Sequence, residues 1–340
     1  MNMFPVQSRG KAMGFIGLAM NFAPAIGPTL SGWIVQSYDW RSIFYVILPL
    51  GIINILVAAF ALKNFGEQTY PKFNFLGIIL STVGLGTLLL GFSNAGDKPW
   101  LTFEVAGFVL IGLIVTGLFI YQQTHTKLPM LNFSVFKHPI FTISSITNFV
   151  VIMGLYGGMI LLPLYIQNVR GVSPMASGMV LLPGAIIMAI MSPITGALYD
   201  RMGARYLSFT GLIILSIGTF MFTLIDMNTS VTYLATMQGV RSFGLGLALM
   251  PIQTDALNDL PLDLMSHGSA MYNTIRQIAG SLGTALLVTI MSISTSNFAA
   301  ENVGISVEEA TLHGIQVAYI VVTVISIVAA MMCLKLSKKK

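Results

Sequence analysis

The feature that most constrains this chain is a series of apolar runs, each long enough to cross a lipid bilayer as a helix. Crossing a hydrocarbon core of roughly 30 Å takes about 20 residues, and helices satisfy their own backbone hydrogen bonds inside lipid. Charged, proline-rich or Asn/Asp-rich breaks separate ten such runs, at 12–36, 42–62, 74–94, 103–122, 141–166, 176–197, 207–225, 231–253, 270–295 and 314–334. The sequence therefore predicts an all-α polytopic membrane protein with ten transmembrane helices.

The composition argues against several other classes of protein. Of the 340 residues, 55% are hydrophobic and only 9% are charged, whereas about a quarter are charged in an ordinary soluble domain. The single cysteine, Cys333, excludes a disulfide framework, and the four histidines have no metal-ligand spacing, so we expect no metal site. The net charge of +5 comes from loop lysines and arginines without interleaved aromatic residues, so we expect no nucleic-acid partner.

Basic residues are distributed unevenly between the two sides of the predicted membrane protein. An even number of spans places both ends of the chain on one side, and loops rich in Lys and Arg stay in the cytoplasm. The side of the two ends carries twelve basic residues: Arg9, Lys11, Lys63, Lys72, Lys127, Lys137, Arg201, Arg205, Lys335, Lys338, Lys339 and Lys340. The opposite loops carry three, Arg41, Lys98 and Arg170. We therefore expect cytoplasmic termini, with the last lysines contacting anionic membrane lipid.

Small residues recur in the first predicted span. They are Gly14, Ala23, Gly27, Pro28, Ser31 and Gly32, in the spacing G-x8-G-x3-G-P-x2-G-G with Ala and Ser replacing two glycines. This stretch resembles the antiporter motif in helix five of drug:proton antiporters of the major facilitator superfamily. In such a motif small residues permit close helix contact and Gly-Pro introduces a kink. The alternative is a general small-residue packing face.

A second pattern lies at a predicted cytoplasmic turn, in GALYDRMGAR at 196–205. Its residues Gly196, Asp200, Arg201, Gly203 and Arg205 resemble the G-x3-D-R-x-G-x-R loop of the second half of major-facilitator proteins. A glycine permits a tight reversal, and the charged side chains can pair with one another or with helix ends as a breakable latch. The alternative is a solvated loop that sets topology by its positive charge.

Further segments, at 162–185 and 240–257, resemble the fourteen-helix branch of the superfamily, the EmrB/QacA type. This resemblance implies that the ten spans correspond to helices five to fourteen and that this sequence lacks the first four. It also implies five parts: 1–63 with the last two helices of the N-terminal half, 64–122 with two inserted helices, the cytoplasmic loop 123–139, the six-helix C-terminal half 140–335 and the basic tail 336–340. The embedded carboxylate that usually couples protons in this family would lie in the first four helices.

Charged residues within predicted spans are functional candidates, because a charge in the membrane costs several kcal/mol unless it faces protein or water. Arg241 lies near the middle of the eighth span, and no acidic residue lies at comparable depth. Its partner could be a backbone carbonyl, a ligand or a carboxylate in the absent helices, and we favour the absent carboxylate or a proton-linked network over the carbonyl. Arg276, in the ninth span, is expected to pair with Asp255 if the two helices are neighbours. The sequence is at least as compatible with a structural contact of Arg276 inside the helix bundle as with a contact to substrate.

A cavity for amphipathic drugs requires adaptable apolar walls with a few polar groups. Candidate residues along such a path, each also compatible with simple packing, are Asn21, Asn148, Tyr156, Met159, Gln238, Gln253 and Asn273.

The resemblance implies a proton-coupled multidrug exporter that works by alternating access in the cytoplasmic membrane of a bacterium. It would need no cofactor beyond the proton gradient, and its partners would be amphipathic or cationic drugs, protons and membrane lipid; an adaptor protein is left open. Two alternatives are an inactive or assembly-dependent fragment of such a transporter and an exporter of a metabolite. A membrane enzyme is disfavoured, since no nucleophile set, metal cluster or paired intramembrane carboxylates occur in the sequence.

Overall fold

The described part of the chain consists of helices and their connections, without strands, as the sequence predicts. The computed structural model describes residues 27, 30–61, 74–96, 98–126, 129–302 and 304–337. Its long helices are α2 (Ser42–Ala61), α3 (Phe75–Asn94), α4 (Phe108–His125), α5 (Pro139–Leu164), α6 (Pro174–Met202), α7 (Ala204–Met221), α8 (Val231–Asn258), α9 (Met265–Glu301) and α10 (Val307–Cys333). Short π-helical or 3-10 turns occupy Phe103–Gly107, Phe133–Lys137, Tyr165–Val169 and Phe222–Leu224.

Eight segments of the described chain are long and apolar enough to cross a membrane. This confirms a multi-pass membrane protein. The 28-residue α8 is not among the eight, because it carries many polar residues, with Arg241 and Asp255 among them. The predicted first span, 12–36, lies mostly outside the described residues. The number of ten helices and the cytoplasmic placement of both termini therefore stay predictions.

Several helices extend beyond the predicted spans. The 37 residues of α9 exceed the predicted range 270–295, and the 29 residues of α6 exceed 176–197. Serine side chains cap the starts of two helices: Ser173 caps α6, and Ser306 forms a capping box with Glu309 at α10. The length of an apolar run marks only the part of a helix that lies in lipid. It therefore underestimates the length of a helix whose capped ends lie outside the lipid. The division into halves and an inserted pair stays a prediction.

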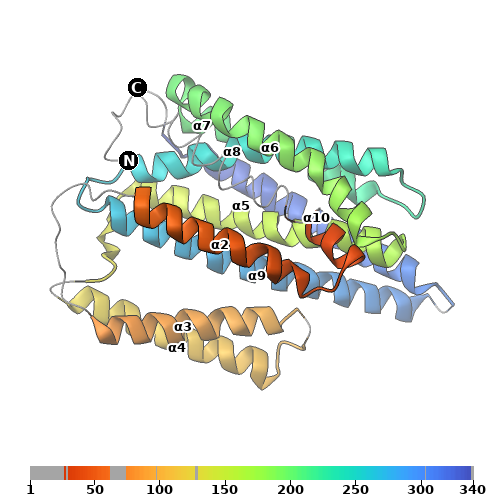
Figure 1. Ribbon diagram of the computed structural model, residues 1–340, viewed down its shortest axis with the longest axis horizontal. Helices are drawn as coiled ribbons and strands as arrows, with labels where there is room; N and C mark the ends of the chain where they lie inside the picture. The colour runs from red at the N-terminus through yellow and green to blue at the C-terminus, as the bar shows by residue number, and fades with distance from the viewer. Residues whose placement is uncertain are drawn as a thin grey trace.

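The helices α5 to α10 lie lengthwise beside one another as a bundle (Figure 1). Within it α8 packs against α6, α7 and α5, and α5 also packs against α9 and α10. The hairpin of α3 and α4 lies along one edge of the bundle and contacts it through α9 (Figure 1). This arrangement brings α3, α5 and α9 to a common region, although they are far apart in sequence.

Glycine allows the bundle helices to approach one another closely. A Cβ added to Gly211 on α7 would lie 2.6 Å from the carbonyl oxygen of Gly244 on α8. A Cβ added to Gly283 on α9 would lie 2.6 Å from Cα of Met153 on α5. Such contacts leave no room for a side chain. Because lipid tails provide no hydrophobic drive between helices, close backbone packing of this kind is a main source of association in membranes.

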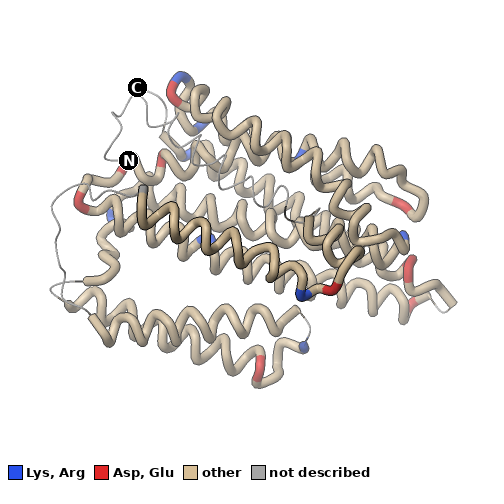
Figure 2. Tube along the Cα trace, in the orientation of Figure 1, with Lys and Arg blue, Asp and Glu red and all other residues tan. Residues whose placement is uncertain are grey.

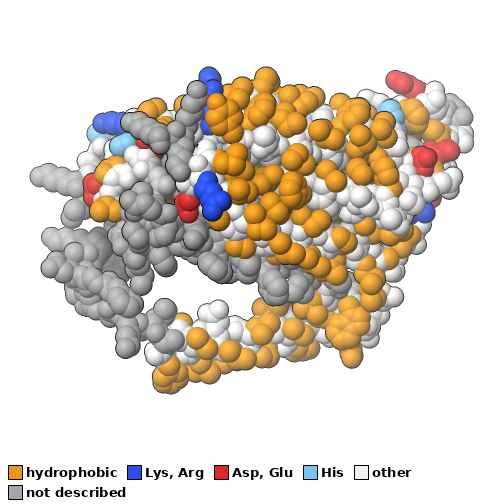
Figure 3. Space-filling model, turned by 90° about the horizontal axis from the view of Figure 1, so that it is seen from above, with side chains coloured by type: hydrophobic (Ala, Val, Ile, Leu, Met, Phe, Trp, Pro, Cys, Tyr) orange, Lys and Arg blue, Asp and Glu red, His pale blue; other side chains and the backbone are white. Residues whose placement is uncertain are grey.

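The charged residues lie mainly toward the two ends of the helices, as expected for a protein with an apolar middle (Figure 2). Apolar side chains cover much of the surface between those ends (Figure 3). The helix α2 is almost entirely exposed: none of its most apolar window is buried, and Phe60 is 87% exposed. Thus α2 is the least covered helix in the described part of the chain.

Candidate functional site

One face of α9 carries polar side chains in its middle section. Gln277 and Ser281 lie four residues apart, as do Gly280 and Thr284, and this spacing places them on one side of an α-helix. None of them carries a formal charge. This stripe is the longest wall of the cavity described next.

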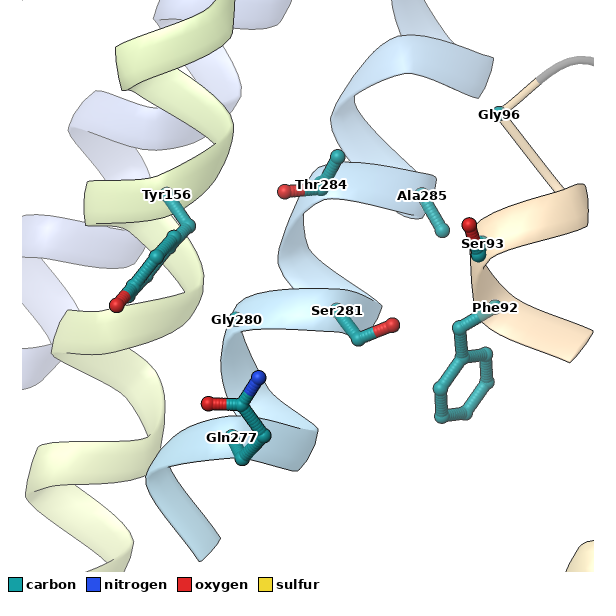
Figure 4. A pocket seen from close by; sticks show the side chains of 9 residues that line it. All are labelled: Phe92, Ser93, Gly96, Tyr156, Gln277, Gly280, Ser281, Thr284 and Ala285. Carbon is teal, nitrogen blue, oxygen red and sulfur yellow. The ribbon is translucent and has the colours of Figure 1, made fainter. Parts of the chain in front are cut away.

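A cavity of about 240 Å³ lies where α9 meets α3 and α5. Besides the α9 stripe and Ala285, it is lined by Tyr156 of α5 and by Phe92, Ser93 and Gly96 at the end of α3. Figure 4 shows Tyr156 on one side of α9 and Phe92 with Ser93 on the other, while the Ser281 hydroxyl points toward α3 and the Thr284 hydroxyl toward α5. The cavity therefore combines two aromatic rings with hydroxyl and amide groups.

Gly280 determines how closely Tyr156 approaches α9. A Cβ added to Gly280 would lie 3.2 Å from Cδ2 of the Tyr156 ring. The ring thus lies directly over the helix backbone, and it remains 39% exposed. A larger residue at 280 would push the ring away and fill the lower part of the cavity.

Hydrogen bonds attach the α3 hairpin to α9 beside the cavity. Nε1 of Trp100 donates to Oγ1 of Thr289 at 2.8 Å, and the same hydroxyl lies 3.2 Å from the carbonyl oxygen of Ala95. Leu88, Phe92, Ala95 and Val105 of the hairpin form a buried cluster with Ala285 of α9. The position of Phe92 is therefore fixed by packing as well as by these polar contacts.

Arg241 is fully inside the bundle, with 1% of its surface exposed. Its Nη2 donates to the carbonyl oxygen of Gly154 on α5 at 3.3 Å, and Gly158 leaves the space that the guanidinium occupies. Among the described residues, Nε of Arg241 and the hydroxyl of Tyr319 have no hydrogen-bond partner, and no carboxylate pairs with Arg241. The carbonyl contact is one of the two predicted alternatives. A carboxylate partner stays a prediction.

The expected pair between Arg276 and Asp255 is not formed. Asp255 is buried at the end of α8 and accepts hydrogen bonds from both the backbone N–H (3.1 Å) and the hydroxyl of Ser337. The helices α8 and α9 touch only slightly, because α5 and α10 are the main neighbours of α9. The pairing was expected only if α8 and α9 were neighbours, and the fold separates them.

The turn motif forms a tight connection between α6 and α7. Gly203 adopts φ +76°, in the left-handed region that favours glycine, and its N–H donates to the carbonyl oxygen of Tyr199 at 2.9 Å. Gly196 is buried, Asp200 is half-buried and Arg201 is exposed. The backbone N–H of Arg205 donates to the carbonyl oxygen of Ser337 at 3.3 Å. The motif thus adjoins the segment after α10, which also contacts Asp255.

The sequence matches the family model described as the Major Facilitator Superfamily over residues 1–284. The chain belongs to the Major Facilitator Superfamily. The Major Facilitator Superfamily is a family of transporters, and the relatives reported next are named as transporters or resistance proteins.

Three relatives illustrate the similarity. The chain is 48% identical over 293 residues to the uncharacterized MFS-type transporter YhcA of Bacillus subtilis (strain 168), covering 86% of this chain and 55% of YhcA. It is 42% identical to the uncharacterized MFS-type transporter YcnB of the same organism, covering 99% and 71% of the two chains. It is 38% identical to the lincomycin resistance protein LmrB of Listeria innocua serovar 6a, covering 99% and 72%. The chain thus spans about half the length of YhcA and under three quarters of YcnB and LmrB.

The antiporter-like motif of this superfamily member is only partly visible. Gly14, Asn21, Ala23 and Pro28 lie outside the described residues. A Cβ added to Gly32 would lie 3.0 Å from the carbonyl oxygen of Pro174, at the start of α6. At this position the small residue does permit a close helix contact. Gly27 has open space around it.

Of the predicted path residues, only Tyr156 lines the cavity. Asn148 and Gln238 are buried elsewhere in the bundle, Asn273 is exposed and bonds to the carbonyl oxygen of Ser269, and Met159 and Gln253 are half-buried. The sequence analysis missed Gln277, Ser281 and Thr284, although their helical spacing in the predicted ninth span could have revealed them. It could not have found Phe92 and Ser93, which reach the cavity through tertiary docking. No group of three or more His, Cys, Asp or Glu residues that could hold a metal occurs among the described residues.

Proposed function

We propose that this superfamily member exports amphipathic drugs, cationic ones among them, across the bacterial cell membrane in exchange for protons. The observation that carries the proposal is the 38% identity to a lincomycin resistance protein over 99% of this chain. Multidrug transporter MdtP of Bacillus subtilis (strain 168), 32% identical over 302 residues, supports the same class of cargo. Alternating access is the mechanism we propose for this transport.

The cavity between α3, α5 and α9 is the proposed point of drug contact. Ligand pockets combine apolar and aromatic walls with a few polar groups that fix orientation. Here Tyr156 and Phe92 supply aromatic surface, while Gln277, Ser281 and Thr284 supply hydrogen-bonding groups. The cavity can hold part of a drug-sized molecule at its volume of about 240 Å³.

Arg241 is the proposed link to the proton gradient. A buried cation with a single carbonyl contact is costly, by several kcal/mol, and such groups within membrane segments commonly mark proton or substrate pathways. We propose that a carboxylate interacts with Arg241 and that this interaction is coupled to protonation of the carboxylate during transport. Following the resemblance to the fourteen-helix branch, we place that carboxylate in helices that precede those described here.

The turn motif is the proposed conformational latch. Its Gly203 reversal and the contacts of Arg205 and Asp255 with Ser337 join α7, α8 and the segment after α10 at one end of the bundle. A transporter that alternates between two states needs contacts that are made in one state and broken in the other. We propose that these contacts hold the state described here.

The test is drug accumulation in drug-sensitive bacterial cells. The cells express either this chain or a version extended upstream along its own gene, and accumulation of lincomycin and of ethidium is measured with and without a protonophore. The proposal predicts lower accumulation with at least one version, cancelled by the protonophore. A reduction only with the extended version would identify the 340-residue chain as an assembly-dependent part. No reduction by either version, at equal expression in the membrane, would contradict drug export and favour a metabolite as cargo.

A further inference from the structure

All nine residues that line the cavity are uncharged. They comprise two aromatic residues, four hydrogen-bonding residues (Ser93, Gln277, Ser281 and Thr284), two glycines and an alanine. A permanent cation that enters such a site loses its hydration without gaining a counter-charge, and aromatic faces replace only part of that loss. An uncharged molecule with a flat apolar part and a hydrogen-bonding edge loses far less. The uncharged lining therefore favours the binding of uncharged ligands over cationic ones.

The end of α3 supplies one wall of this cavity. Phe92 is 8% exposed and packs in the cluster with Ala285, so its ring cannot swing freely. Ser93 is exposed on the cavity side. The contact of Trp100 with Thr289 lies one helical turn beyond Thr284 and Ala285 and holds the hairpin at this level of α9. Without the hairpin, the cavity would have no wall on the α3 side of the α9 stripe.

We infer that α3 forms part of a binding site for uncharged amphipathic molecules and that Phe92 and Ser93 help to determine its specificity. This inference rests on the proposed function, since it takes the cavity as a place where transported molecules bind. It assigns to the α3 hairpin a direct role in ligand recognition. It also limits the drugs that bind in this cavity to uncharged ones, so the cationic drugs of the proposed function would bind outside it.

The test is a binding measurement that needs no transport. Trp100 lies beside the cavity, and the chain contains only two other tryptophans, Trp33 and Trp40. With both replaced by Phe, the purified chain in lipid nanodiscs reports binding of the neutral probe N-phenyl-1-naphthylamine through energy transfer from Trp100. Empty nanodiscs supply the background. Competition with triphenylphosphine oxide, which is neutral, and with methyltriphenylphosphonium, a cation that carries the same three phenyl groups, measures the discrimination against charge.

The inference predicts saturable binding that the neutral competitor displaces at a concentration at least about tenfold lower than the cation. Phe92→Ala is expected to weaken probe binding about tenfold through loss of the aromatic wall. Phe75→Ala, at a position of the same helix that is 71% exposed, serves as the matched control and should leave binding unchanged. Equal displacement by both competitors would overturn the assignment of the ligand class.

A second pair of variants covers the case in which Phe92→Ala disturbs the hairpin. Ser93→Phe adds bulk on the cavity side without touching the buried cluster, whereas Ser81→Phe adds the same bulk farther along α3. Binding lost in Ser93→Phe and kept in Ser81→Phe supports the wall, and binding kept in both overturns it. Binding with this pattern but without efflux in cells would contradict only the proposed function. Efflux in cells without this pattern of binding would contradict only this inference.

Discussion

The helices α2 and α5 are both apolar enough to cross a membrane, yet their surroundings differ completely. None of the most apolar window of α2 is buried, whereas half of that of α5 is. The difference follows from side-chain size and polarity. Bulky aliphatic and aromatic residues make up most of α2, while α5 carries small and polar residues that point inward, Ser144, Ser145, Thr147, Asn148, Gly154, Gly157 and Gly158.

In lipid, therefore, apolar character does not mark the interior of a bundle. Lipid tails are as apolar as leucine, so helices associate through close backbone contact and shared hydrogen bonds. Among the described residues, Gly51 of α2 has nothing within 4 Å of an added Cβ, while Gly283 faces the backbone of α5. The following predictions test this contrast, from the largest expected effect to the smallest.

Substitution of a buried interhelical glycine should have the largest effect. Gly283→Leu would force α9 away from Met153 of α5, and overpacking of this kind typically costs about 1–3 kcal/mol or more. Gly51→Leu adds the same side chain to open space on α2 and should leave stability unchanged. Thermal unfolding of the two purified variants in detergent is the measurement. Equal melting temperatures for both would contradict the contrast between the helices.

Arg241→Gln should separate function from stability. The substitution removes a buried cation whose described hydrogen-bond partner is one carbonyl of α5, so the melting temperature should stay the same or rise. Coupled efflux, if Arg241 belongs to the proton pathway, should be lost. The control is Arg276→Gln, which makes the same substitution at an arginine that is only half-buried, on α9. Unchanged drug resistance at equal expression would exclude the proposed role of Arg241.

Asp255→Asn should loosen the segment that follows α10. Ser337 loses its charged acceptor, and buried Cys333 beneath this segment becomes accessible. We expect the rate of maleimide labelling of Cys333, the single cysteine of the chain, to rise severalfold. Asp263→Asn, at an exposed position after α8, is the matched control, and Cys333→Ser establishes the labelled site. A labelling rate equal to that of the control would show that Ser337 does not cover Cys333.

The smallest effect is expected at the loop after α7, to which the segment that follows α5 is attached. The hydroxyl of Tyr165 donates to the carbonyl oxygen of Asp226 at 2.6 Å. The pKa of Asp226 is lowered, first by the backbone N–H of Asn228 and then by the hydroxyl of Thr229. A lowered pKa means that these contacts stabilise the loop above the ordinary pKa of Asp and weaken as the pH falls through the lowered one.

Amide hydrogen exchange measures this effect. At equal intrinsic exchange rates, the N–H of Asn228 should exchange faster once the pH falls below the lowered pKa of Asp226. In Asp226→Asn this dependence on pH should disappear. Protection that does not change with pH in the unsubstituted chain would contradict the loop contacts.

The sequence predicted the class of fold well because the length of an apolar run directly indicates a helix that can cross a membrane. It predicted the Gly203 reversal for the same kind of reason, since a positive φ requires glycine. It failed for the pair of Arg276 and Asp255, because neighbouring helices in sequence need not be neighbours in space. It found one cavity residue, Tyr156, and missed the α9 stripe and the α3 wall. Their convergence depends on where the α3 hairpin docks, and Trp100 and Thr289 meet across 189 residues of sequence.

The most direct test of the central proposal is proton movement in inside-out membrane vesicles that contain the version of this chain found active in the accumulation assay. Respiration acidifies the vesicles, and a pH-sensitive dye reports the gradient while drug is added. Drug:proton exchange predicts that each drug addition partly dissipates the gradient, and that Arg241→Gln abolishes the response. Drug accumulation in these vesicles with no change in the proton gradient would contradict proton coupling.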